Sequence, residues 1–418
     1  MQCLARGLCI TILLAACAAG RLRAQTSYTW SEIRSKFETE NPNLRAGRVG
    51  IDESRADEIT AHLRPNPTFT VLGDQLDPFT FHPFRPFYNA LPLGTFEYLH
   101  ERQHKRELRL ESAQMATAIT MSNQADLERN LLFDLRNQFV QTLQAKAVLA
   151  LARENLAYYD HVLTISRDRL NAGDIAQVDM GRLELQRIQY ESDVTTAQVN
   201  LRTAKIQLLM FLNNRMPVEQ FDVDGPFDFV DQLYPLADIR KLARDSRPDL
   251  RAAAESVEKA RTDHRLAIAN GSTDPTFGVD AGRNPPLDHY AGISVSIPLR
   301  IFDRNQGEKL RTELEIARTE RLRDAAEVQV FSDVDSAYAI VGSNLELLRP
   351  YKAKYLKQAL QVRDTVTFAY QSGGASLLDF LNAQSEYRSI QLNYLNLVGS
   401  YLSGANQLNL AAGREVLQ

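Results

Sequence analysis

The two halves of this chain carry the same landmarks in the same order. The matched pairs, at offsets of 200 to 208 residues, are Asn41-Pro42-Asn43-Leu44 with Arg247-Pro248-Asp249-Leu250, Pro67-Thr68-Phe69 with Pro275-Thr276-Phe277, and Gly173 with Gly373. Several matched landmarks in one order indicate an internal duplication. Any fold proposed for the first half must therefore also suit the second, and we expect both halves to build one intertwined body.

Each half contains two short segments in which apolar residues alternate with small or polar ones. A period of two is typical of strands with one apolar face and one wet face. The four segments are 68–71, 95–98, 276–281 and 292–297. The residues expected to face membrane lipid on these strands are Phe69, Val71, Phe96, Tyr98, Phe277, Val279, Ile293, Val295 and Ile297.

After each pair of strands the apolar period lengthens to about 3.5, which predicts long helices. No proline occurs between residues 102 and 170, and only Pro350 interrupts residues 306–370. The second run carries a coiled-coil-like apolar stripe. Its positions are Val334, Tyr338, Val341, Leu345 and Leu348, and it is predicted to resume at Tyr355, Ala359 and Val362. Each run then meets a glycine turn and returns through 178–212 or 377–410, which predicts an antiparallel hairpin.

The predicted fold class is mainly α with a small β part: duplicated long helical hairpins plus four strands per chain. A helix of ~65 residues extends roughly 100 Å. Four strands cannot close a membrane barrel, because the smallest barrels need about eight. The missing strands must come from other copies of the chain. We therefore expect a homotrimer, with an outer-membrane barrel of about twelve strands on a periplasmic α-helical barrel.

Residues 1–24 have the features of a signal peptide: Arg6, an apolar core at 8–19 and then small residues. Cleavage after Ala24 is one prediction. The other is a lipoprotein signal that ends at residue 16, because Leu14-Ala15-Ala16-Cys17 resembles a processing box after which Cys17 becomes the lipid anchor. All three cysteines lie in this segment, so no disulfide is expected in the mature chain.

The rest of the chain divides at its composition changes. We expect a first structural repeat at 25–213, a proline- and acid-rich linker at 214–238, a second repeat at 239–412 and a C-terminal tail at 413–418. The formal net charge of −4 argues against nucleic-acid binding, which requires a basic face.

No catalytic motif stands out, so we predict no enzyme, no metal site and no cofactor. His100 and His104 have the spacing of two metal ligands on a helix face, but cations surround them. We expect these cations, Arg102, Lys105 and Arg106, to reach lipid headgroups at the membrane–water boundary.

Over essentially the whole mature chain, the sequence resembles the TolC-like outer-membrane efflux proteins. The most specific matches are the paired turn motifs, which run from Arg169-Leu170-Asn171-Ala172-Gly173 to Asp179 and from Tyr370 through Gly373 to Asp379. The resemblance implies an exit duct of a tripartite efflux or type I secretion system, located in a Gram-negative-type outer membrane. The implied partners are outer-membrane lipid, a periplasmic adaptor and an inner-membrane pump or secretion ATPase.

In this family the hairpin tips form the periplasmic gate and the adaptor contact. The resemblance places these residues there: Gly173, Asp174, Asp179, Tyr370, Gly373, Gly374 and Asp379. Asp379 is a candidate for an acidic ring, although Ser376 three residues earlier also predicts a helix-capping box. Where studied members have an arginine that ties the gate shut this chain has Ala375, and a second acid is replaced by Asn382. The alternative function is a periplasmic coiled-coil adaptor or scaffold, although such proteins usually carry one hairpin in a β-rich body.

Overall fold

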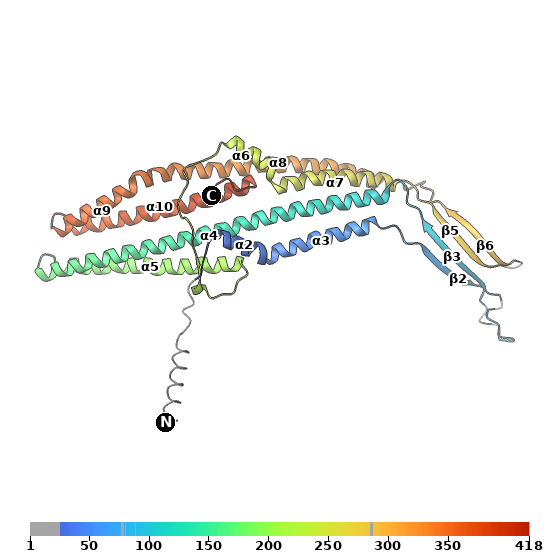
Figure 1. Cartoon of the computed structure of the whole chain (residues 1–418), viewed down its shortest axis with the longest axis horizontal. Coiled ribbons are helices and arrows are strands. Elements are labelled where there is room, and N and C mark those ends of the chain that lie inside the picture. The colour runs from blue at the N-terminus through green and yellow to red at the C-terminus, as the bar shows by residue number, and fades with distance from the viewer. Residues whose placement is uncertain (1–25, 77–78, 80, 88, 285–286, 418) are drawn as a thin grey trace, which may run out of the picture.

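The computed structural model describes residues 26–76, 79, 81–87, 89–284 and 287–417. Cys17 and the export segment lie outside the described residues. The molecule is elongated, with a small sheet at one end and the tips of two helical hairpins at the other (Figure 1). No described helix has enough length and apolar character to cross a bilayer.

The two halves consist of corresponding elements, as the repeat predicts. The first half contains α2 (Trp30–Glu40), α3 (Pro42–His62), β2 (Thr68–Asp74), β3 (Leu91–Leu99), α4 (Lys105–Ala172) and α5 (Gln177–Phe211). The second contains α6 (Leu236–Ser246), α7 (Pro248–Asn270), β5 (Thr276–Asn284), β6 (Leu287–Ser296), α8 (Gln306–Pro350), α9 (Leu356–Gln371) and α10 (Leu377–Ala412). In each half a proline starts the second short helix, because proline disfavours a helical residue before it.

The repeat extends to the buried core. Ile33 on α2 and Ile239 on α6 correspond in the repeat, and each is almost fully buried in its own apolar cluster. The cluster around Ile33 packs α2 and α3 against α4 and α5. The cluster around Ile239 packs α6 against α8 and α10. The halves join where α4 of the first half packs against α7 and α10 of the second.

The predicted apolar stripe is confirmed before Pro350, and it changes beyond that residue. Val334, Val341, Leu345 and Leu348 are buried. The helical run continues through Pro350 by a π-helical turn, Tyr351–Tyr355, and then becomes α9. A π turn contains more residues per turn than an α-helix, so it rotates the following stripe.

The prediction for the resumed stripe is therefore wrong in part. Tyr355 is 43% exposed and Val362 is 49% exposed, whereas Ala359, Thr367 and Tyr370 are the buried residues of α9.

The four long strands form one antiparallel sheet in the order β2-β3-β5-β6. The two hairpins therefore lie side by side, and within the chain β2 and β6 are left as open edges. A second, parallel sheet pairs β1 (Thr26–Tyr28) with β4 (Phe221–Val223). This small sheet attaches the linker to the first half, and it was not predicted.

Candidate functional site

The strand registers place the predicted lipid-facing side chains on one face of the sheet, which we call the outward face. Phe69, Phe96, Val279 and Ile293 form one row across all four strands. A second row on the same face contains Tyr98, Phe277 and Val295. These side chains are largely uncovered, up to 88% for Ile293. Ile297, by contrast, lies one residue beyond the end of β6, so its placement within a strand is wrong.

The opposite face of the sheet is polar and acidic. Thr70, Thr95 and Asp280 form one row on it, and the next row contains Glu97 and Ser294. No lysine or arginine occupies this face at the described strand positions whose registers are known. The sheet thus has one face suited to lipid and one suited to water and cations.

At the junction between the sheet and the helices, the expectation that the basic side chains reach lipid headgroups is wrong for Lys105. Arg102 is exposed, but the side chain of Lys105 is only 4% exposed and lies 2.5 Å from Asp274. Burial alone would raise the pKa of Asp274, but hydrogen bonds from Lys105 and from the Arg102 backbone outweigh it and lower that pKa. Lys105 therefore fixes the strand–helix junction and cannot reach lipid headgroups.

Both hairpin tips turn at a glycine with left-handed backbone geometry. Gly173 has φ 86° and Gly373 has φ 77°. Backbone hydrogen bonds from Asp174 to Arg169 and from Gly374 to Ala369 close the two helix ends in the same way. No neighbouring atom would contact a Cβ at either glycine, so the backbone angle alone requires glycine at both tips.

The acids at the tips are held by local contacts. Asp379 completes a capping box with Ser376 at the start of α10, and hydrogen bonds from the Ser376 side chain and backbone lower its pKa. Its side chain remains exposed, so it presents a negative charge at the tip. Asp179 lies in the first turn of α5, 3.8 Å from Arg182, and Asp174 is exposed.

Tyr370 is the buried centre of the tips. Its ring stacks on Phe380 at 4.9 Å and belongs to an apolar cluster that includes Tyr159 and Leu163 of α4. Arg169, at the end of α4, donates to the carbonyl of Tyr370 at 2.9 Å and lies over its ring. Arg169 thus ties the first hairpin to the second.

A second arginine joins the two hairpins further from the tip. The guanidinium of Arg363 on α9 lies 4.2 Å from the ring of Tyr158 on α4 and 4.2 Å from the ring of Tyr387 on α10. The hydroxyl of Tyr158 also lies within hydrogen-bond distance of Thr367. Arg363 also pairs with Asp364 on its own helix at 2.7 Å, and the cation–π contacts add to the packing between the hairpins.

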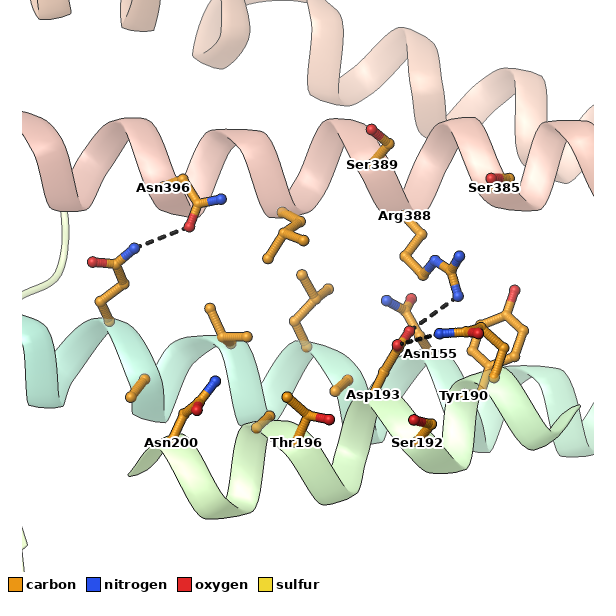
Figure 2. Close-up of a pocket in the computed structure, with 18 of the residues that line it drawn as sticks. Asn155, Tyr190, Ser192, Asp193, Thr196, Asn200, Ser385, Arg388, Ser389 and Asn396 are labelled. Carbon is orange, nitrogen blue, oxygen red and sulfur yellow. Dashed lines mark hydrogen bonds and ion pairs between the residues drawn. The ribbon is translucent and has the colours of Figure 1, made fainter. Parts of the chain in front are cut away.

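A groove of about 790 Å³ runs between the two hairpins (Figure 2). It is bounded by α4, α5 and α10, and ion pairing of Arg388 with Asp193 and a hydrogen bond from Gln144 to Asn396 cross it at 3.0 Å each. Its lining mixes aliphatic side chains such as Val148, Leu151 and Leu392 with amide and hydroxyl side chains: Gln141, Asn155, Gln189, Ser192, Thr196, Asn200, Ser385 and Ser389. The groove was not predicted, because its walls come from segments that are far apart in the sequence.

The exposed sheet with open edges, the long hairpins and the glycine-turned tips define the subunit of an outer-membrane channel. The family of outer membrane efflux proteins matches residues 239–414. The chain is 23% identical to the cobalt-zinc-cadmium resistance protein CzcC of Cupriavidus metallidurans, over 90% of this chain and 87% of that protein. It is 25% identical to the pyoverdine export outer membrane protein OpmQ of Pseudomonas aeruginosa, over 67% of this chain and 60% of that protein.

Solved structures show the same fold. CusC is 16% identical and superposes with a TM-score of 0.76, over 91% of each chain. VceC of Vibrio cholerae is 15% identical and superposes with a TM-score of 0.75, over 92% of this chain and 96% of that one. The sequence and the fold are thus similar to those of the TolC-like outer-membrane efflux proteins. The chain has the fold of these channel subunits, with four strands in one sheet and two long helical hairpins.

Proposed function

We propose that this outer-membrane channel is the exit duct of a tripartite efflux system that expels heavy-metal cations. The observation that carries the duct is the four-stranded sheet with an uncovered apolar face and two open edges, at the far end of helices roughly 100 Å long. Such a sheet is stable in lipid only when identical neighbours close it into a barrel. A periplasmic adaptor or scaffold protein does not require a sheet with an uncovered apolar face, so this sheet argues against that alternative.

The cation cargo is supported by two observations. The polar face of the sheet carries Glu97 and Asp280, and the paired strand positions on that face include no basic residue. A channel lined by carboxylates attracts cations and repels anions. A relative that matches over 90% of this chain is a cobalt-zinc-cadmium resistance protein.

An adaptor contact is supported by the tips and the groove. The groove offers hydrogen-bonding side chains on a wall made of helices packed side by side, which suits a polar helical hairpin of a partner. The tips add the charges of Asp174 and Asp379. We assign the gate and the docking region for the adaptor to the end of the molecule that carries Gly173 and Gly373.

Metal tolerance and channel conductance test the proposal together. Deleting the gene should lower tolerance to cobalt, zinc or cadmium, and the plasmid-borne gene should restore it. Replacing Glu97 and Asp280 with Asn should weaken the cation preference of single trimers in planar bilayers, whereas replacing the exposed outward residue Ile293 with Val should not change it. Unchanged metal tolerance in the deletion strain would exclude heavy-metal cations as the cargo. Purified protein that shows no conductance in bilayers would exclude a channel function.

Cysteine cross-linking tests the adaptor contact. The native cysteines all lie within residues 1–17, so a single introduced cysteine gives a clean signal. Cysteines at Asn200 and Ser385, in the groove, should cross-link to a periplasmic protein of the same transport system. A cysteine at Glu53, an exposed residue of α3, serves as the control. Equal cross-linking at all three positions would contradict a docking role for the groove.

A further inference from the structure

The sheet has a cavity near the end that is farthest from the helices, and Val71, Gly94 and Ala281 of the outward face line it. Its volume is about 440 Å³. The floor is made by Gly94 and Ala281, which are paired in the register, and Val71 and Pro92 lie beside them. The row that contains Gly94 and Ala281 thus has small side chains, whereas the neighbouring row, with Phe96 and Val279, has larger ones.

Two basic side chains lie at the loop end of this cavity. Arg283 on β5 and His289 on β6 both line the cavity, where the strand register shifts between Gly282 and Asn284. Both are exposed. The outward positions of the described strands carry no carboxylate, because Glu97 and Asp280 lie on the opposite face. None of the residues that line this cavity is a carboxylate.

We propose that this cavity binds a phosphorylated glycolipid of the outer leaflet. One acyl chain lies over Gly94 and Ala281, and a headgroup phosphate is bound by Arg283, with His289 as a second donor. The proposal rests on the outward orientation of the apolar face in the trimer. The cavity lies toward the ends of the strands that are connected by loops, away from the periplasmic helices, so it faces the outer leaflet (Figure 1).

The arrangement favours a phosphate over a general lipid contact. An arginine fork matches two phosphate oxygens and binds them more strongly than a point charge does. At the edge of the hydrocarbon layer water competes less, and an anionic headgroup gains more from such a contact. A concave apolar floor beside the cation adds dispersion contacts that a flat sheet would not offer.

Native mass spectrometry of the purified trimer tests the proposal, with bis-phosphorylated lipid A and the same lipid without phosphates as probes. Arg283→Gln should lower retention of the phosphorylated probe by about tenfold and leave the other probe unchanged. Gly94→Leu should lower retention of both probes, because it fills the floor; a Cβ there meets its nearest atoms only at 3.8 Å. Arg102→Gln is the matched control, because Arg102 is exposed at the opposite end of the sheet.

Equal retention of both probes by the unmodified trimer would overturn the proposal, and so would an Arg283→Gln variant that retains the phosphorylated probe normally. If Gly94→Leu does not assemble, the comparison of Arg283→Gln with Arg102→Gln still shows whether Arg283 binds the phosphate of the probe. The metal-tolerance assay is read separately. A variant that loses metal tolerance but retains lipid normally is defective in the duct. A variant that loses lipid retention but keeps metal tolerance is defective in the lipid site.

Discussion

At the scale of single residues, the break between short helices shows how the two halves diverged. In the first half Asn41 caps α3 by accepting hydrogen bonds from the backbone of Asn43 and Leu44. Arg247 occupies the equivalent position and has no such cap. Its side chain is 6% exposed and pairs with Asp249 and Asp333 instead. The repeat predicts the turn at this position, but it does not predict the change from a cap to an ion pair.

We expect Arg247→Met to lower the free energy of unfolding by about 2 kcal/mol. Removing one member of a buried ion pair costs more than this, but both carboxylates are about one-third exposed and water screens them. Thermal unfolding followed by circular dichroism measures the loss. Arg251→Met is the control, because Arg251 is exposed and its pair with Glu255 is long. Equal losses in the two variants would contradict the role given to Arg247.

The same ion pair predicts a dependence on pH. Burial would raise the pKa of Asp249, but the hydrogen bond and charge of Arg247 outweigh it, so that pKa lies below its ordinary value. The contribution of the carboxylate is complete above its unfolded pKa of about 4 and is lost as the pH falls through the lower folded value. The difference between the native protein and Arg247→Met should therefore narrow below about pH 4. A constant difference down to acid unfolding would contradict this.

The tip glycines allow a matched comparison. Gly373→Ala should cost about 1 kcal/mol, because an alanine at φ 77° is strained. Gly374→Ala should be nearly neutral, because Gly374 does not have positive φ and the added Cβ meets only the Ala369 carbonyl, at 3.5 Å. Hydrogen exchange of residues 366–384 measures both. Equal protection in the two variants would show that backbone strain does not control this turn.

At the scale of elements, the π turn after Pro350 is held by the linker. Arg349 pairs with Asp231 at 2.8 Å, Lys352 pairs with Asp228 at 2.5 Å, and the Lys352 ammonium lies over the ring of Phe229. The linker thus crosses the place where α8 passes into α9. Mid-helix π turns often mark positions where a helix bends.

We expect the double change Asp228→Asn and Asp231→Asn to loosen this turn. Amides of residues 351–371 should then exchange with solvent several-fold faster, because the two ion pairs no longer hold the helix to the linker. Asp224→Asn, in the same linker on an exposed side chain, serves as the control. Unchanged exchange in the double variant would show that the linker does not restrain α9.

Most elements could be predicted from the sequence, because alternation over four or more residues and unbroken runs without proline are strong local signals. The strands β1 and β4 were missed because three residues are too few to show alternation. Exposure at Tyr355 and Val362 was missed because a π turn leaves no clear mark in the sequence. The contacts of Arg169 and Arg363 with residues of the other hairpin depend on tertiary packing, which periodicity cannot show.

At the scale of the whole molecule, the trimer can be tested through the open edges. Thr70 on β2 and Ser294 on β6 lie on the polar face, on the two edge strands. Thr70→Cys combined with a cysteine at Gly292, Ser294 or Ser296 should give a covalent trimer for at least one pair, because neighbouring copies close the barrel through these strands. Denaturing electrophoresis detects it. Thr70→Cys alone is the control, and monomers in every double variant would contradict the closure.

The duplication also has a consequence for stoichiometry. Three copies with two similar hairpins each surround the duct with six nearly equivalent helical pairs, although the symmetry of the assembly is only threefold. A partner that forms a ring of six could therefore engage every pair. It would meet two alternating kinds of binding position, because the groove between α4, α5 and α10 is not repeated symmetrically within the described part of the chain and the two tips differ in their side chains. Such a ring should bind in two affinity classes of equal number.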